Sequence, residues 1–125
     1  MRTPTNVGSR VPAACTGLGK SILAMSDPET VQRVLREGLT RRTPYSIVDP
    51  NRFLAELAAV RANGVAIDRE EAALGLSCVA APIMVKGEVI GAVSMSLPSA
   101  RLNPATNVPL IRRTAENIAA DYRAL

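Results

Sequence analysis

Apolar residues recur at helical spacing in four stretches of the chain, and polar segments separate these stretches. Positions three or four apart lie on one face of a helix, so each stretch predicts an amphipathic helix. The residues of the four apolar faces are, in order, Leu18, Ile22, Leu23 and Met25; Val31, Val34 and Leu35; Phe53, Leu54, Leu57, Ala58 and Val60; and Ile111, Ala115, Ile118, Tyr122 and Leu125. The last of these helices is expected to begin near Pro104.

Two of the helices carry capping signals in their first turn. The segment Ser26-Asp27-Pro28-Glu29 combines a capping box with a first-turn proline, and Asp49-Pro50 begins the next helix in a similar way. Gly38 and Gly64 supply the stops. The polar residues 39–48 between these two helices predict a connecting loop.

The C-terminal half contains the clearest strand pattern. Residues 77–85 and 88–96 are rich in β-branched side chains, and the link Lys86-Gly87 predicts a β-hairpin. Both strands are mostly apolar, so the sheet is expected to be covered on both faces. A short strand over residues 65–67 leads into an acidic corner at residues 68–71. These elements predict one α+β domain over residues 1–125, in which the first dozen residues form an irregular lead-in or an edge strand.

Composition excludes several classes of function. A chain of 125 residues is long enough for one domain, and no apolar run reaches the roughly 18–20 residues of a membrane span. The polar N-terminal segment indicates no secretory signal. Histidine is absent, which excludes His-based triads and His-liganded metal sites. The few aromatic side chains cannot form the usual stacking platform for single-stranded nucleic acid.

The net charge of +4 raises the question of nucleic-acid binding. The 15 basic residues are spread along the whole chain, however, with arginine pairs only at residues 41–42 and 112–113. Since affinity for nucleic acid depends on clustered phosphate contacts, we interpret these charges as solvated surface or intrachain ion pairs. Cys15 and Cys78 lack metal-ligand spacing, and reduced thiols in a cytoplasmic protein are expected.

The segment Gly17-Leu18-Gly19-Lys20-Ser21 ends like a phosphate-binding P-loop. That pattern requires a glycine at position 14, where this chain has Ala14, and Pro12 is unsuited to the central strand that precedes such a loop. A P-loop-like nucleotide-binding protein is therefore the less favoured alternative. Glycines at the start of a helix also let N–H groups approach a ligand, so residues 16–19 either hold a carboxylate or merely form a tight turn.

Four further polar residues are candidates for ligand contact: Asp68, Cys78, Ser94 and Ser96. The two serines lie two residues apart on one strand, so their hydroxyls are paired donors if that face lines a cavity and surface groups if it does not. Cys78 either shares this cavity or is a small buried side chain. Asp68 is a ligand contact or a turn residue, and Glu70 and Glu71 are expected to be surface or corner-fixing charges. No base lies beside a nucleophile, so no active site is predicted.

Five stretches of the chain form a specific combination. They are residues 8–12 (GSRVP), 16–24 (TGLGKSILA), 57–64 (LAAVRANG), 68–82 (DREEAALGLSCVAAP) and 91–96 (GAVSMS). In order and spacing they resemble the effector-binding domain of IclR-type bacterial transcription regulators. The resemblance implies a GAF-like fold, an antiparallel sheet flanked by helices, with a cupped pocket for a small metabolite that is often an organic acid.

By this resemblance, seven residues are expected at the effector pocket. They are Gly17, Leu18, Asp68, Leu76, Cys78, Ser94 and Ser96. The N–H groups of Gly17 and Leu18 would meet a carboxylate, and Leu76 would form an apolar wall. No cofactor, metal or enzymatic activity is implied. The expected partners are a small organic acid and further copies of the chain, in a dimer or tetramer, without membrane contact.

Two departures from the family pattern change the expectation. IclR-type regulators begin with a winged helix-turn-helix, which this chain lacks, so DNA contact is expected only through a domain absent from it. The opening strands of the effector domain are also expected to be missing, since the match begins close to Met1. The leading hypothesis is an N-terminally truncated effector-binding and oligomerisation domain of a transcriptional regulator. A structural oligomerisation module that senses no ligand is the main alternative.

Overall fold

The computed structural model of the protein describes residues 10–125. Helices come first along this range, and a three-stranded sheet and a long C-terminal helix follow. The elements are η1 (Ala13–Cys15), α1 (Gly17–Ala24), α2 (Pro28–Glu37), α3 (Pro50–Asn63), β1 (Ala66–Arg69), β2 (Leu76–Val85), β3 (Glu88–Pro98), η2 (Ser99–Arg101) and α4 (Pro104–Arg123). The predicted α+β class is confirmed. Part of the motif at residues 8–12 and most of the expected lead-in fall outside the described residues.

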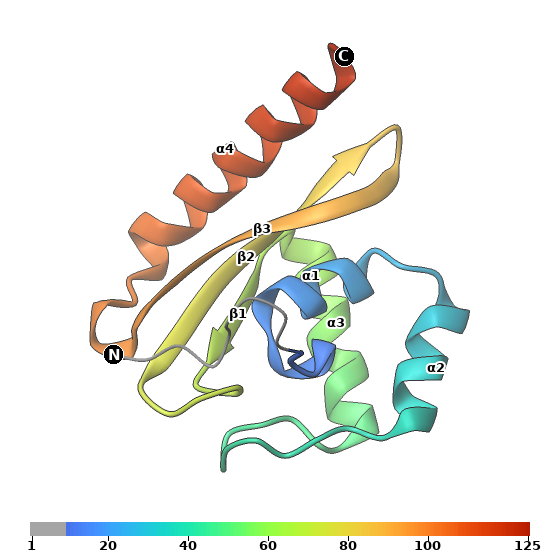
Figure 1. Ribbon diagram of the computed structural model, residues 1–125, viewed down its shortest axis with the longest axis vertical. Helices are drawn as coiled ribbons and strands as arrows, with labels where there is room; N and C mark the ends of the chain where they lie inside the picture. The colour runs from blue at the N-terminus through green and yellow to red at the C-terminus, as the bar shows by residue number, and fades with distance from the viewer. Residues whose placement is uncertain (1–9) are drawn as a thin grey trace.

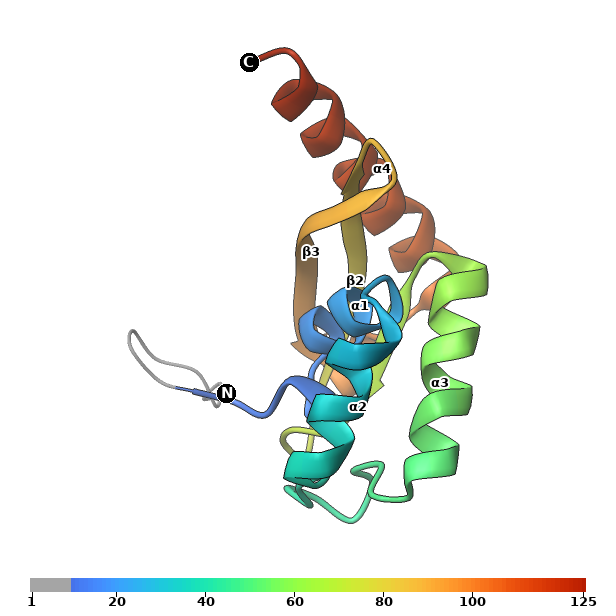
Figure 2. The same ribbon diagram turned by 90° about the vertical axis from the view of Figure 1, so that its right-hand side faces the viewer.

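The sheet has the strand order β1-β2-β3, and both neighbouring pairs are antiparallel. The α1 helix packs on one face of the sheet and against α3, while α4 runs along the opposite face (Figures 1 and 2). Lys86 and Gly87 form the predicted hairpin turn, and both adopt positive φ angles, of 54° and 79°. No helix within residues 10–125 is long and apolar enough to cross a membrane.

The central strand β2 is buried on both faces because its alternate side chains enter two different layers. One set, which includes Val79, Ala81 and Ile83, packs against α4. The other set, which includes Cys78 and Ala80, lies under α1. The edge strand β3 is only half-buried over much of its length, so the prediction that both hairpin strands are covered on both faces is correct for β2 and wrong for β3.

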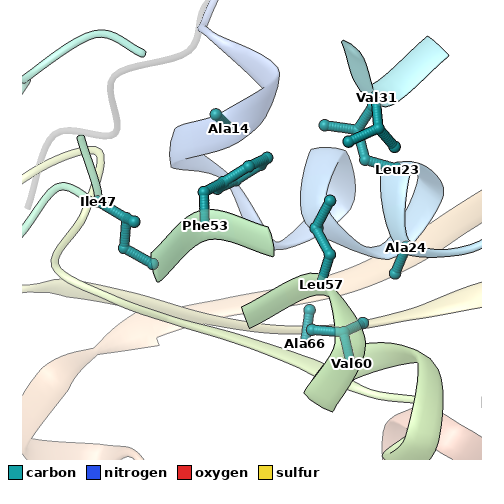
Figure 3. Packing of buried hydrophobic residues seen from close by; sticks show 9 residues of the cluster. All are labelled: Ala14, Leu23, Ala24, Val31, Ile47, Phe53, Leu57, Val60 and Ala66. Carbon is teal, nitrogen blue, oxygen red and sulfur yellow. The ribbon is translucent and has the colours of Figure 1, made fainter. Parts of the chain in front are cut away.

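A second hydrophobic cluster joins α1, α2 and α3 to the sheet (Figure 3). Phe53 is fully buried in it and lies among Ala14, Ile47 and Leu57. The predicted start signals contribute to this arrangement because Asp27 and Asp49 cap α2 and α3 by accepting backbone N–H groups, at 2.8 and 2.9 Å. Asp27 rather than Ser26 is the cap, since the Ser26 hydroxyl donates to the Ile22 carbonyl.

The buried face of α1 differs from the predicted one. Leu18 and Ile22 are about two-fifths exposed, whereas Gly17, Lys20 and Ser21 are buried. Small residues at positions 17 and 21 let the helix approach the sheet closely, and this close packing takes precedence over the apolar spacing. Leu23 is buried as predicted.

Two of the other three apolar faces need smaller corrections. In α3, Phe53, Leu57 and Val60 are buried as predicted, while Leu54 and Ala58 are exposed. In α4, Ile111 and Ala115 are buried, but the stripe continues through Ala119. The predicted members Ile118, Tyr122 and Leu125 are instead exposed. Ala115 and Ala119 are the small residues that face β2 at this end of the helix.

Candidate functional site

Three polar side chains form a row across the sheet. Asp68 on β1 is the register partner of Cys78 on β2, and Cys78 is in turn the partner of Ser96 on β3. Ser94 lies two residues away on the same face of β3, opposite Ala80. The strand β1 begins and ends later than residues 65–67, so Asp68 stands on a strand rather than in the predicted turn. Asp68 and Ser96 are separated by two strand spacings, or about 10 Å.

The N-terminus of α1 lies above this row. The Thr16 hydroxyl accepts the Gly19 N–H at 2.9 Å and caps the helix. The first N–H groups of a helix have no intrahelical acceptor. The Gly17 N–H is directed at the Cys78 sulfur, and the Leu18 N–H can meet a ligand. A β-carbon at position 17 would lie 3.0 Å from the Cys78 Sγ and 3.1 Å from the Ala80 Cβ. Glycine at this position therefore allows the helix to come close to the sheet.

A cavity of about 170 Å³ separates the helix N-terminus from the row of side chains. All seven residues expected from the resemblance line it. They are Gly17, Leu18, Asp68, Leu76, Cys78, Ser94 and Ser96. Val11, Thr16 and Ala72 complete the lining. Of these, Val11 and Ala72 were not predicted as lining, although both belong to the matched motifs; they carry no polar group that would have singled them out.

Burial sets the protonation of the two ionisable groups in the cavity. Loss of solvation raises the pKa of Asp68 to about 6; the N–H of Glu71 and the charge of Lys20 oppose this rise, and the charge of Glu71 adds to it. Burial also raises the pKa of the Cys78 thiol, although hydrogen bonds from Ser94, Ser96 and Gly17 partly lower it. At neutral pH the cavity therefore presents a neutral thiol and a carboxyl group close to its titration range.

Behind the cavity, a buried ion pair joins α1 to the turn after β1. The Lys20 ammonium is fully buried, lies 2.9 Å from the Glu71 Oε2 and donates to the Ile67 carbonyl at 2.8 Å. Glu71 is thus a buried corner-fixing charge, one of its two predicted roles. Because Lys20 is committed to this pair, it cannot reach a phosphate, and the P-loop interpretation of residues 17–21 is wrong.

The free cysteines and the acidic residues do not assemble into a metal site. Cys15 and Cys78 are both buried and unlinked, and Cys15 donates its thiol to the Thr40 carbonyl. Residues 10–125 contain no group of three or more cysteine or carboxylate side chains placed to hold a metal ion.

A family model described as "Bacterial transcriptional regulator IclR C-terminal" matches residues 1–120. The chain belongs to the IclR family. Within the family, it is 39% identical over 118 residues to the HTH-type transcriptional repressor AllR of Klebsiella pneumoniae, a match that covers 90% of this chain and 43% of AllR. The chain thus spans less than half the length of the curated relatives it matches. These relatives are regulators of transcription, not enzymes.

Two solved structures of similar fold carry small aromatic acids. An IclR homolog from Microbacterium hydrocarbonoxydans, complexed with 4-hydroxybenzoate, superposes with a TM-score of 0.92 at 27% identity. The match covers all of this chain and 52% of the homolog. The inducer-binding domain of a PobR double mutant from Acinetobacter, complexed with 3-hydroxybenzoic acid, has a TM-score of 0.81 at 34% identity, over 90% of this chain and 67% of its own. The fold is therefore that of the IclR C-terminal domain.

Proposed function

We propose that residues 1–125 form a single domain that binds a small organic acid in the cavity between α1 and the sheet, and so serves as the effector-binding part of an IclR-type regulator. The cavity carries the proposal because it unites seven predicted residues with complementary chemistry. Backbone N–H groups and two serine hydroxyls can donate to a carboxylate, while Asp68 lies at the far end of the row. The acids bound by the two neighbours support this assignment.

The size and polarity of the cavity favour a compact hydroxy acid. A volume of 170 Å³ is below the roughly 300–1,000 Å³ of pockets that enclose drug-sized ligands. The carboxylate would lie near Gly17 and the serines, and a hydroxyl group would donate to Asp68. Leu76 would cover the carbon skeleton.

The test is a thermal-shift screen of the purified chain with lactate, pyruvate, 3-hydroxybenzoate and 4-hydroxybenzoate. An acid present at 100 times its Kd should raise the Tm by roughly 10 °C. We expect lactate to give a larger rise than pyruvate, which lacks the hydroxyl donor. The double variant Ser94→Ala/Ser96→Ala should weaken binding at least about tenfold, because hydrogen bonds to charged groups are lost.

Ser26→Ala is the matched control, since the Ser26 hydroxyl bonds to the Ile22 carbonyl instead of lining the cavity. It should leave the ligand-induced rise in Tm unchanged. If no acid in the screen changes the Tm or is detected by calorimetry, effector binding by this chain is refuted and the purely structural alternative is favoured.

We also propose that the chain forms homo-oligomers in the cytoplasm and contacts DNA only through a domain outside residues 1–125. Exposed apolar side chains on β3 and α4, including Ile90, Ile118 and Tyr122, support self-association. Light scattering after size exclusion should give the mass of a dimer or tetramer, and Tyr122→Glu should shift the mass towards the monomer. A wild-type monomer at all accessible concentrations would contradict this assignment.

A further inference from the structure

The Lys20 ammonium is surrounded by a complete set of protein acceptors. It donates to both carboxylate oxygens of Glu71, at 2.9 and 3.0 Å, and to the Ile67 carbonyl at 2.8 Å, and it lies 3.4 Å from the Glu56 Oε1. An unpaired buried ammonium would be strongly destabilising, whereas three donors with these partners are satisfied. Because Lys20 is fully enclosed, it fixes the positions of Glu71 and of the Ile67 carbonyl, and so of the groups bonded to them.

Glu71 in turn holds the cavity carboxylate. Its backbone N–H donates to the Asp68 Oδ1 at 2.8 Å, and its Oε2 accepts the Arg69 N–H at 3.2 Å. Together with the Lys20 bond to the Ile67 carbonyl, the pair thus binds the backbone on both sides of Asp68. Neither Lys20 nor Glu71 lines the cavity itself.

We propose that Lys20 and Glu71 are positioning residues of the effector cavity, which set the orientation and the charge of Asp68 and thereby decide which ligand group is accepted at that end. This inference rests on the proposed function of the cavity. With Asp68 ionised, that end accepts a hydroxyl or amide donor; with Asp68 protonated, it can donate to a carboxylate or carbonyl oxygen.

The charged and titratable groups around Asp68 come from four elements. Glu71 follows β1, Lys20 lies on α1, Cys78 lies on β2 and Cys15 lies in η1. The two thiols are neutral at physiological pH because burial raises the pKa of each. Glu71 and Lys20 are therefore the charges that act on Asp68, with opposite signs.

The first experiment needs no ligand. The side-chain carboxyl carbon of Asp68 is titrated by NMR in the full chain, as wild type and as four variants. Lys20→Met should raise the pKa of Asp68 because the Glu71 charge is no longer balanced, and Glu71→Gln should lower it because a like charge is removed. Lys20→Arg should restore behaviour close to the wild type. Lys86→Met, at the chain's other lysine in the exposed hairpin turn, is the matched control and should change nothing.

Removal of one partner of a buried pair can prevent folding. The double variant Lys20→Met/Glu71→Gln leaves no buried charge unpaired, and its Asp68 should titrate between the two single variants. If Asp68 titrates at the same pH in the wild type, in Glu71→Gln and in the double variant, the pair does not control its charge and the inference is wrong.

The second experiment is a double-mutant cycle on ligand affinity, measured by calorimetry with lactate as the probe. Lys20→Met should weaken binding about tenfold in the wild-type background and less than twofold in the Asp68→Asn background, because its effect passes through Asp68. Equal effects in both backgrounds would reduce Lys20 to a general structural role and overturn the inference. If lactate does not bind the wild type at all, the proposed choice of ligand fails, while the titration still decides the role of the pair.

Discussion

At the scale of single residues, Gly17 makes the cavity possible. Gly17→Ala would place a methyl group 3.0 Å from the Cys78 Sγ and 3.1 Å from the Ala80 Cβ, closer than ordinary van der Waals contact. The helix must then move outward, which displaces the N–H groups that face the cavity. We expect a loss of about 1–3 kcal/mol in the free energy of unfolding and at least tenfold weaker binding of the acid, measured by urea denaturation and calorimetry. Retained affinity in a destabilised variant would show that the helix N-terminus does not hold the ligand.

Asp68 gives the stability of the protein a specific pH dependence. Its pKa is raised from 3.8 to about 6 on folding, so between these values the folded state holds a proton that the unfolded chain releases. The protonated Asp68 therefore adds to the free energy of unfolding, by at most about 3 kcal/mol. This added stability is fully present below about pH 4 and is lost as the pH rises through 6. Urea denaturation at a series of pH values should show this fall in the wild type. In Asp68→Asn the free energy of unfolding should change less between pH 4 and 6, and an identical slope in both proteins would contradict the assignment.

At the scale of the elements, the helix caps provide a clean test of local stability. The Asp27 carboxylate accepts the Thr30 N–H at 2.8 Å, and this bond lowers the pKa of Asp27. Asp27→Ala should reduce the free energy of unfolding by about 1 kcal/mol, measured by urea denaturation at neutral pH, because a first-turn N–H loses its acceptor. Asp27→Asn keeps an acceptor and should cost much less. Equal losses in both variants would show that charge, not capping, stabilises α2.

The elements that the sequence predicts well are those with local signals. The caps at Asp27 and Asp49 and the turn at Gly87 depend on neighbouring residues, and all three are where the sequence places them. The buried faces of α1 and α4 are predicted less well, because the contacts with distant strands decide which side chains are buried. In α1, the close approach of Gly17 to β2 takes precedence over the apolar spacing. Lys20 is the clearest case, since no local pattern shows that Glu71, 51 residues away, encloses it.

At the scale of the whole molecule, the site depends on contacts between distant segments. The cavity joins the start of α1 to all three strands, so its residues come together only when the sheet and the helix are both formed. Spacing alone could pair Ser94 with Ser96 on one face but could not place Asp68 in their row. The resemblance to a known family supplied that information, and the register of the sheet shows its physical basis.

Residues 10–125 contain two hydrophobic clusters, one among α1, α2, α3 and β1 and one between β2 and α4, and this arrangement predicts how the protein unfolds. Leu57 belongs to the cluster with α1 to α3, and Ile111 belongs to the cluster with α4. Because α1 covers one face of β2 and α4 covers the other, loss of either helix exposes the same strand, so both layers should melt in one transition. Leu57→Ala and Ile111→Ala should each lower the free energy of unfolding by about 2–5 kcal/mol.

The measurement follows the urea transition by circular dichroism and, in parallel, by hydrogen exchange at α3 and at α4. Both probes should report the same midpoint in the wild type and in each variant. Leu125→Ala, at a fully exposed position, is the control and should leave the midpoint unchanged. If Ile111→Ala releases α4 while α3 stays protected, the two layers are separate cooperative units. The α4 face could then rearrange without disturbing the cavity, which lies on the opposite face of β2 beneath α1.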